Sequence, residues 1–588
     1  MVWAVNPNLT GEQVVEIVLE TADRPVGLDG RLSYPIVNAA AAVEHAAQLQ
    51  TNPLPEREPS GILMGNVVSY YTNEGIEGGV QVVVFSEDVF TLIASTSTAL
   101  GRTPSGETTG ELELVLPAST YRIFFFPPAP YLPKQMDVNV IENNVTVLAP
   151  VTLRRSTPDD PSQGEMEGSG TETNPYIIMN ARQLYNVRNN LSAHYRLGAN
   201  IELSGVDWTP IGGVGLRQQA FTGSLDGNGF VISNMRIIDS NRSERGLFGA
   251  LGNDASIRNV TLRDIYIDGG ETVGGIAALV VGTVTIENCH VSGEILNTTS
   301  TAGGIVGEDR HGLVTISNST NSAMISALET ASAGGILGSV RRSNTGDPPA
   351  IIERCVNMAT VKAGFAGGIR GTGLPATIRW SYNIGSIEGI SAAGGISAMG
   401  ANNISESYNA GSITANGYAG GIIGRTGVPT VIENSINFGS VESTHEFGLA
   451  GGIAGRLDGS HTRITTNLMN VGNIRGRWSV GGIAGRFEGI LELVYNSGSI
   501  TGVTHSTGSL IGHTNAGFLN DGFYMPGTAE RAVGTRDLTA IGRLHARTLT
   551  GIAPTIIYAS WDFGDVWSID PNVNNGLPFL SSTIENTP

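Results

Sequence analysis

Gly274-Gly275-Ile276 is the first of eight Gly-Gly-Ile triplets, and this series decides the fold. The other seven triplets occupy residues 303–305, 334–336, 367–369, 394–396, 420–422, 451–453 and 481–483. Successive triplets are separated by 29, 31, 33, 27, 26, 31 and 30 residues. A unit of this length is too small to bury its own apolar face, so the repeat predicts stacked rungs of a solenoid.

The glycine pairs predict a tight corner in every rung. Glycine adopts positive φ without steric cost, and we expect this to be the structural role of the second glycine in each pair. The alternative role is a close approach of the backbone to a ligand. The second glycines are Gly275, Gly304, Gly335, Gly368, Gly395, Gly421, Gly452 and Gly482.

An asparagine follows an apolar strand in seven of the repeats. These residues are Asn321, Asn357, Asn383, Asn409, Asn437, Asn470 and Asn496. In stacked rungs they would form a ladder, because an asparagine amide both donates to and accepts from backbone at a corner and tolerates left-handed conformation. We expect an internal ladder, and the alternative is a polar stripe that binds glycans.

Charge and composition exclude several classes of partner. The 588 residues carry a net charge of −19, which opposes binding to nucleic acid and to anionic membranes. No run of 18 apolar residues is present, so we expect no membrane insertion. Cys289 and Cys355 lie two repeats apart, about 10 Å at a strand spacing of about 4.8 Å. That is too far for a disulfide, and we expect buried thiols.

Few residues suggest chemistry. Paired carboxylates do not recur at the rung period, and no histidine pair has zinc-ligand spacing. The chain as given is therefore expected to be non-catalytic, with no cofactor and no metal. Asp226-Gly227-Asn228-Gly229 lacks the further oxygen ligands of a calcium loop and predicts a turn. Trp380, Tyr382 and Tyr408 fall on adjacent rungs, where they either stack on sugar rings or pack on one another.

Residues 168–588 resemble GLUG-motif proteins, which are secreted bacterial β-helix proteins that include adhesins. The resemblance rests on the triplets, on the entry motifs at residues 208–212 and 221–229, and on the closing motifs at residues 561–567 and 575–580. It implies a right- or left-handed parallel β-helix over 168–515 and a C-terminal cap over 516–588. A short helical segment is expected near residues 181–190.

Two other resemblances concern the N-terminal part. Residues 59–155 alternate as short strands and resemble carboxypeptidase-regulatory-like and Cna-B-type β-sandwich modules, most clearly from Gly110 to Tyr121. The polar residues 156–167 are expected to be a linker. Residues 1–50 resemble the helical end of a subtilisin-like serine protease domain, through Asn6-Pro7-Asn8-Leu9-Thr10 and Val37-Asn38-Ala39. The catalytic motifs of that family would precede Met1, so no catalytic residue carries over.

These observations predict a secreted or cell-surface bacterial β-helix protein. We expect a monomer whose lateral face binds surface glycans or extracellular proteins in adhesion. One alternative is the C-terminal targeting region of a secreted subtilisin-like endopeptidase. A second alternative is a purely structural stalk.

Overall fold

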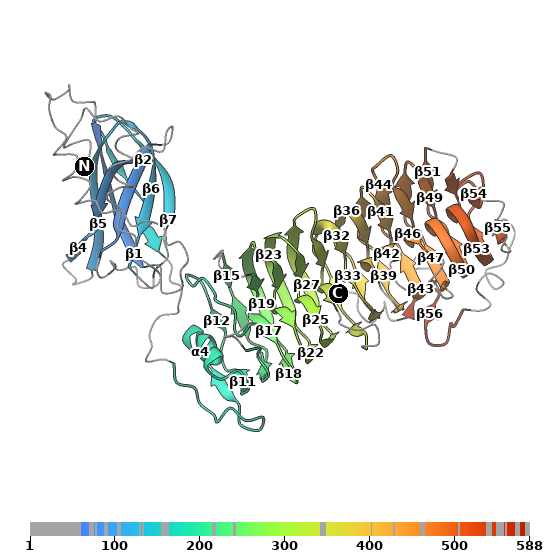
Figure 1. Ribbon diagram of the computed structural model, residues 1–588, viewed down its shortest axis with the longest axis horizontal. Coiled ribbons are helices and arrows are strands. Elements are labelled where there is room, and N and C mark those ends of the chain that lie inside the picture. The colour runs from blue at the N-terminus through green and yellow to red at the C-terminus, as the bar shows by residue number, and fades with distance from the viewer. Residues whose placement is uncertain are drawn as a thin grey trace. The chain divides into compact units, whose positions relative to one another are not determined.

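A computed structural model describes residues 60–153 and 164–581, apart from short stretches within both ranges. The described residues are mainly β, with 61% strand and 2% helix, which confirms the predicted fold class. It divides into an N-terminal unit and a C-terminal unit, each with its own core (Figure 1). The helices predicted within residues 1–50 lie outside the described residues. In the described part of the chain, no helix has the length and apolar character needed to cross a lipid bilayer.

The N-terminal unit contains two β-sheets that share an apolar core, as the sequence predicts, and most of their strand pairs are antiparallel. One sheet has the order β4 (Ala99–Arg102), β5 (Thr108–Pro117), β1 (Ser60–Ser69) and β8 (Val145–Val147), with β9 (Val151–Leu153) also paired to β1. The other has the order β3 (Leu92–Ser97), β2 (Gln81–Ser86), β6 (Ser119–Phe126) and β7 (Lys134–Val140). Leu63, Leu116 and Phe125 are buried in the core. Tyr121 stabilises the turn between β5 and β6, since its Oη donates to the Pro117 carbonyl at 2.7 Å.

The C-terminal unit is a parallel β-solenoid of about 10 turns. It begins beside helix α4 (Ala181–Asn186), where the Asn180 side chain accepts from the Gln183 amide at the N-terminus. Strands in the regular rungs pair with the strand four positions later, so one rung contains four strands. Figure 1 shows the rungs side by side from β11 (His194–Leu197) to β53 (Ile511–Tyr524).

Three strand columns flank the glycine pairs and the corner that follows them. The column before the glycine pairs comprises β16 (Glu244–Arg245), β20 (Thr272–Gly274), β24 (Thr301–Gly303), β28 (Ser332–Gly334), β32 (Val361–Gly367), β36 (Ile387–Gly394), β41 (Tyr418–Gly420), β45 (Leu449–Gly451), β49 (Ser479–Gly481) and β52 (Ser506–Gly508). The column after the pairs comprises β17 (Phe248–Leu251), β21 (Ala277–Val280), β25 (Val306–Arg310), β29 (Leu337–Arg341), β33 (Arg370–Gly373), β37 (Ser397–Met399), β42 (Ile423–Arg425), β46 (Ala454–Leu457), β50 (Ala484–Asn496) and β53. The next column comprises β18 (Ala255–Arg258), β22 (Thr283–Glu287), β26 (Leu313–Ser317), β30 (Ala350–Glu353), β34 (Ala376–Arg379), β38 (Asn403–Ser405), β43 (Val431–Asn437) and β47 (Thr465–Asn470).

The glycine pairs are required for a reason other than the one predicted. None of the eight second glycines has a positive φ, so the conformational explanation was wrong. Space is what they provide. A Cβ on Gly421 would lie 2.1 Å from the carbonyl oxygen of Gly452 in the next rung and 2.2 Å from Cγ of Asn437. The corresponding two groups crowd each second glycine from Gly304 to Gly482, so only a residue without a side chain lets these rungs stack.

The seven asparagines form one continuous, fully buried ladder. The Nδ2 of each donates to the Oδ1 of the next at 2.7–2.9 Å, from Asn321 to Asn496. The same nitrogen also donates to the carbonyl two residues later, as from Asn437 to Gly439 at 2.8 Å. These asparagines lie in strands, whereas left-handed corners belong to a different column that includes Asn288 and Asn434. A glycan has no access to the ladder.

The strand stack continues past the predicted boundary at residue 515. Strand β53 pairs with β54 (Val533–Arg536) and β55 (Leu544–Thr548). The closing segment lies against the side of the rungs, where Trp561 and Trp567 pack in one cluster with Ile436 and Met469. The Trp567 Nε1 donates to Asn434 Oδ1 at 3.3 Å, and Figure 1 shows β56 (Trp567–Ser568) beside β43. The segment therefore covers a flank of several rungs.

Candidate binding groove

The three aromatic residues predicted as a sugar platform lie on adjacent rungs, but they use their ring faces for packing. Tyr382 and Tyr408 are stacked, with ring centroids 4.6 Å apart and planes 8° apart. Burial raises the pKa of both phenols above the usual value. The guanidinium groups of Arg354 and Arg379 lie 4.4 and 4.6 Å from the Trp380 ring.

The Trp380 indole nitrogen is also engaged, since it donates to Glu406 Oε2 at 2.9 Å. Tyr408 additionally meets the edge of Phe438 and belongs to the cluster under the closing segment. The structure brings Tyr382 and Tyr408 together as a packing pair. Sequence reasoning therefore located a real aromatic column, but this column offers a ligand little free ring face.

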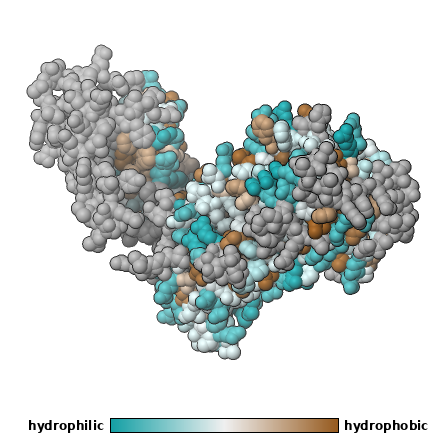
Figure 2. Space-filling model, turned by 45° about the vertical axis from the view of Figure 1, so that its right-hand side comes forward, coloured by the Kyte–Doolittle hydropathy of each residue, from teal (hydrophilic) through white to brown (hydrophobic). Residues whose placement is uncertain are grey.

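A groove of about 490 Å³ lies elsewhere, between the strand column before the glycine pairs and the column after them. Tyr418 lines it from the first column, and Phe447 and Trp478 line it from the turns just before β45 and β49 of that column. Arg456, Arg486 and His513 line it from the second column. Arg425 does not line this hollow itself, but it pairs with Arg456, and its guanidinium lies 5.3 Å from the ring of Tyr418, which does line it. We call the hollow together with Arg425 the arginine groove. On the solenoid face drawn in Figure 2, hydrophobic residues lie in small patches separated by hydrophilic ones.

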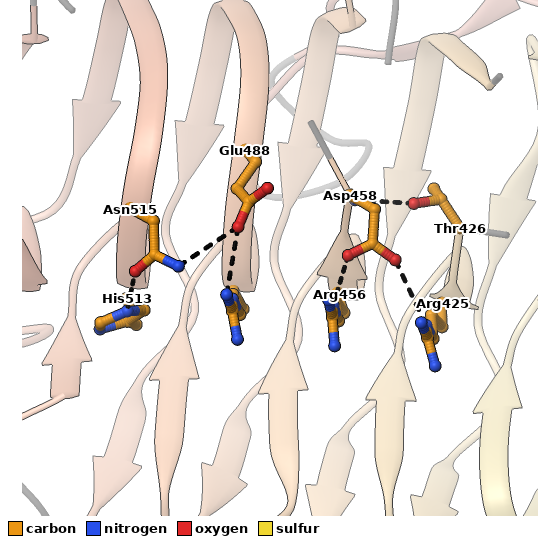
Figure 3. A network of polar contacts seen from close by, with 8 residues as sticks. Arg425, Thr426, Arg456, Asp458, Glu488, His513 and Asn515 are labelled. Atoms are coloured by element: carbon orange, nitrogen blue, oxygen red, sulfur yellow. Dashed lines mark hydrogen bonds and ion pairs between the residues drawn. The ribbon is translucent and has the colours of Figure 1, made fainter. Parts of the chain in front are cut away.

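The basic wall is a column in register over four rungs. Arg425 pairs with Arg456, Arg456 with Arg486, and Arg486 with His513. Figure 3 shows Arg425, Arg456 and His513 at equivalent positions on their strands. Parallel pairing fixes this arrangement, because a residue at one position of a rung lies beside the same position of the next rung at about 4.8 Å.

Carboxylates hold the arginine side chains in place. Asp458 accepts from Arg456 Nε at 2.5 Å and from Arg425 Nε at 3.3 Å, and its own amide donates to Thr426 Oγ1 at 2.8 Å. Glu488 accepts from Arg486 Nη2 at 3.1 Å. Partial burial opposes the charged form of Arg456, but Asp458 outweighs it and raises the pKa of this guanidinium. Each of these five side chains keeps between 24% and 35% of its surface exposed.

The contacts continue to the last residue of the column. Asn515 Nδ2 donates to Glu488 Oε1 at 3.3 Å, and Asn515 Oδ1 lies 2.7 Å from His513 Nε2 (Figure 3). Three arginines against two carboxylates leave one net positive charge, before any contribution from His513. This groove is therefore locally basic on a chain whose net charge is −19.

The opposite wall presents large aromatic side chains to solvent. Phe447 is 60% exposed and Trp478 is 48% exposed, and their rings meet edge to face at 5.3 Å. Tyr418 lies under the guanidinium of Arg425 at 5.3 Å. Exposed aromatic side chains gathered at a concave site are typical of ligand-binding surfaces.

The sequence does contain a signal for the basic wall. Arginine is the fourth residue after the second glycine in three consecutive repeats, as Gly421-Ile422-Ile423-Gly424-Arg425 shows. The same spacing gives Arg456 after Gly452 and Arg486 after Gly482. Alignment of the repeats on their triplets would have predicted an arginine column.

The remaining chemical candidates have structural partners. Asp226 accepts from the Asn228 amide and from Asn259 Nδ2, each at 3.0 Å, and it lies 3.3 Å from Arg258, so its oxygens hold a turn. Cys289 and Cys355 are free and buried, as predicted. Burial raises the pKa of both thiols to about 12. Within the described residues, no group of three or more His, Cys, Asp or Glu is placed to hold a metal ion.

Comparisons with known proteins match parts of the chain. The family described as M26 IgA1-specific metallo-endopeptidase N-terminal region matches residues 174–293. Halomucin of Haloquadratum walsbyi is 36% identical over 151 residues, which are 24% of this chain and 2% of halomucin. A protein of Evansella cellulosilytica named a Gly-rich membrane protein is 39% identical over 132 residues, 21% of this chain and 14% of that protein.

One crystal structure gives a further comparison. A protein assigned as an immunoglobulin A1 protease from Bacteroides ovatus has a TM-score of 0.25 and 20% identity, over 71% of this chain and 94% of that chain. This chain thus spans only a small fraction of the two curated relatives that it matches.

Proposed function

We propose that this chain is part of a secreted or cell-surface protein, and that its arginine groove binds a glycan or an extracellular protein in adhesion. One observation carries the proposal, namely that Phe447 and Trp478 expose their rings directly opposite a column of tethered arginines. Burying two such rings against a ligand supplies much of the binding free energy. Side chains already held by Asp458 and Glu488 lose little conformational entropy on binding.

The family resemblances belong to the same proposal. We infer a GLUG-type repeat in the solenoid, a Cna-B-like spacer over residues 59–155 and a subtilisin-like remnant over residues 1–50. The names of the relatives, which include a membrane protein and a metallo-endopeptidase region, support a location at or outside the cell surface. The proposal takes the chain itself to be a monomer and to be non-catalytic. The pairing of Asp458 and Glu488 with arginines supports the second part, because neither carboxylate is left free for acid–base chemistry.

A second candidate function is supported by the match to a metallo-endopeptidase N-terminal region. The solenoid would then direct a peptidase domain in the same polypeptide to its substrate. In that case the groove binds the substrate protein of the peptidase. Binding measurements on protein ligands and on glycans distinguish this candidate from adhesion to a glycan.

Arrays of glycans and extracellular proteins, probed with the full chain, test the proposal. We expect binding of a ligand by the wild type and a loss of at least tenfold in affinity for the Phe447→Ala/Trp478→Ala variant. Phe518→Ala is a matched control, because Phe518 is 48% exposed but does not line the groove. Equal affinities of the groove variant and this control would contradict the proposal, and a wild type that binds nothing would favour a structural stalk.

A further inference from the structure

The arginine groove repeats one cation per rung, and this repetition restricts its ligand. Arg425, Arg456 and Arg486 occupy one register position on three consecutive rungs. Their backbones are therefore separated by about 4.8 Å per step. A ligand that contacts all three needs anionic groups repeated at a similarly short interval along an extended chain. A single small anion would engage only one or two of them.

The carboxylate tethers set the orientation of the guanidinium groups. Asp458 contacts the Nε atoms of Arg425 and Arg456 from one side (Figure 3). The terminal nitrogens of these two arginines point away from Asp458 in that view. A guanidinium held in this way presents its planar N–H groups to a carboxylate, which is a geometry that arginine favours.

The groove also offers hydrogen-bond acceptors and aromatic rings. Asp458 and Glu488 lie beside the arginines, and their oxygens can accept from hydroxyl groups. Phe447 and Trp478 supply apolar ring surface on the opposite wall. A sugar acid matches all three features, because it combines hydroxyl donors, a carboxylate and an apolar ring face. A DNA backbone brings hydrogen-bond acceptors only and has no hydroxyl donor for the oxygens of Asp458 and Glu488.

The same strip of the solenoid continues toward its N-terminal end as a second hollow of about 510 Å³. Hydroxyl groups line it, including those of Thr301, Ser332, Ser339 and Thr372. Strand register connects the two hollows, since Met399 of the second hollow pairs with Arg425, and Arg425 pairs with Arg456 of the first. A ligand chain that leaves the arginine groove along this strip meets further hydrogen-bonding side chains.

We propose that the arginine groove binds an acidic polysaccharide, and that Arg425, Arg456 and Arg486 each bind the carboxylate of a successive sugar residue. This inference rests on the proposed binding function and specifies its ligand. It predicts a requirement for carboxylates on the sugar chain, which neutral glycans do not meet.

Calorimetric titration of the full chain tests this inference, with oligosaccharides of galacturonate, mannuronate and glucuronate as probes. We expect at least one uronate to bind and its carboxyl methyl ester to bind at least tenfold more weakly. The Arg425→Gln/Arg456→Gln variant should lose about a hundredfold, because each charge-assisted contact contributes about tenfold. Arg475→Gln is the matched control, since Arg475 is 71% exposed and pairs with Glu442 away from the groove. It should bind like the wild type.

Three outcomes would overturn the inference. If the methyl ester or a neutral glycan binds as tightly as the uronate, carboxylate recognition is wrong while the groove remains a glycan site. If dextran sulfate or single-stranded DNA binds more tightly than every uronate, the groove recognises sulfate or phosphate and not carboxylate. If no probe binds but a protein ligand does, the ligand class is wrong and the binding function stands. The ester comparison uses the wild-type chain, so it stays decisive even if the arginine variant misfolds.

Discussion

Replacing Asn437 by alanine should remove a central link of the ladder. Three hydrogen bonds disappear, each 2.8 Å long, with Asn409 Nδ2, Gly439 O and Asn470 Oδ1 as the partner atoms. Each bond contributes about 1 kcal/mol net, and a buried partner left unsatisfied costs about 1–3 kcal/mol more. Water cannot replace the lost amide where Asn437 is fully buried. We therefore expect the free energy of unfolding to fall by about 3–6 kcal/mol.

Tryptophan fluorescence during urea unfolding measures the stability of the solenoid unit, where this loss is expected. Five of the six tryptophans belong to the solenoid unit, and residues 60–153 contain none. Asn403→Ala is the matched control, because Asn403 lies on a neighbouring rung in β38 with an exposed side chain. Its effect should stay within about 0.5 kcal/mol. Equal urea midpoints for the two variants would refute the stabilising role assigned to the ladder.

Three further predictions follow from the same structure. Gly421→Ala should destabilise the solenoid by at least about 2 kcal/mol, since its Cβ would lie 2.1 Å from the Gly452 carbonyl oxygen. Gly564→Ala is the control and should change the urea midpoint little, because the atom nearest to its added Cβ is 3.2 Å away. The buried thiols of Cys289 and Cys355 have a pKa of about 12 in the folded chain and a lower pKa in the unfolded chain, so their contribution to stability is complete below about pH 9 and falls as the pH rises from 9 to 12. The Cys289→Ser/Cys355→Ser variant should therefore lose less stability than the wild type over that range. Identical pH profiles of the two proteins would count against this reasoning. Trp567→Ala should detach the closing segment, because Trp567 is fully buried between Trp561 and the flank of the rungs, and faster amide hydrogen exchange at residues 561–568 would show it.

The regular core of the solenoid was predictable because stacking imposes one constraint on every rung. Each triplet places its second glycine against the next rung, and each ladder asparagine occupies the same buried position. Such positions tolerate one residue type, so their spacing in the sequence is visible. The reason for glycine was not predictable, because the sequence does not separate a need for positive φ from a need for space.

The groove was harder to predict for a physical reason. Its aromatic wall comes from segments of unequal length, so Phe447 lies five residues before Gly452 and Trp478 lies four residues before Gly482. Exposed side chains satisfy no stacking constraint and therefore need not recur. Trp380, Tyr382 and Tyr408 recur visibly because they pack along the stack, which is also why they have little free ring face.

The asparagine ladder has a direction. All six inter-rung amide bonds run from an Nδ2 to the Oδ1 of the following rung, and Asn496 ends the series by donating to the Ser509 carbonyl at 3.0 Å. The two termini of the ladder thus need different closing groups, whereas every interior link is interchangeable with its neighbours. Duplication or loss of one whole interior repeat in the gene would leave every amide with a partner. Such a protein can change its length, and the reach of any surface along its side, in steps of a single rung.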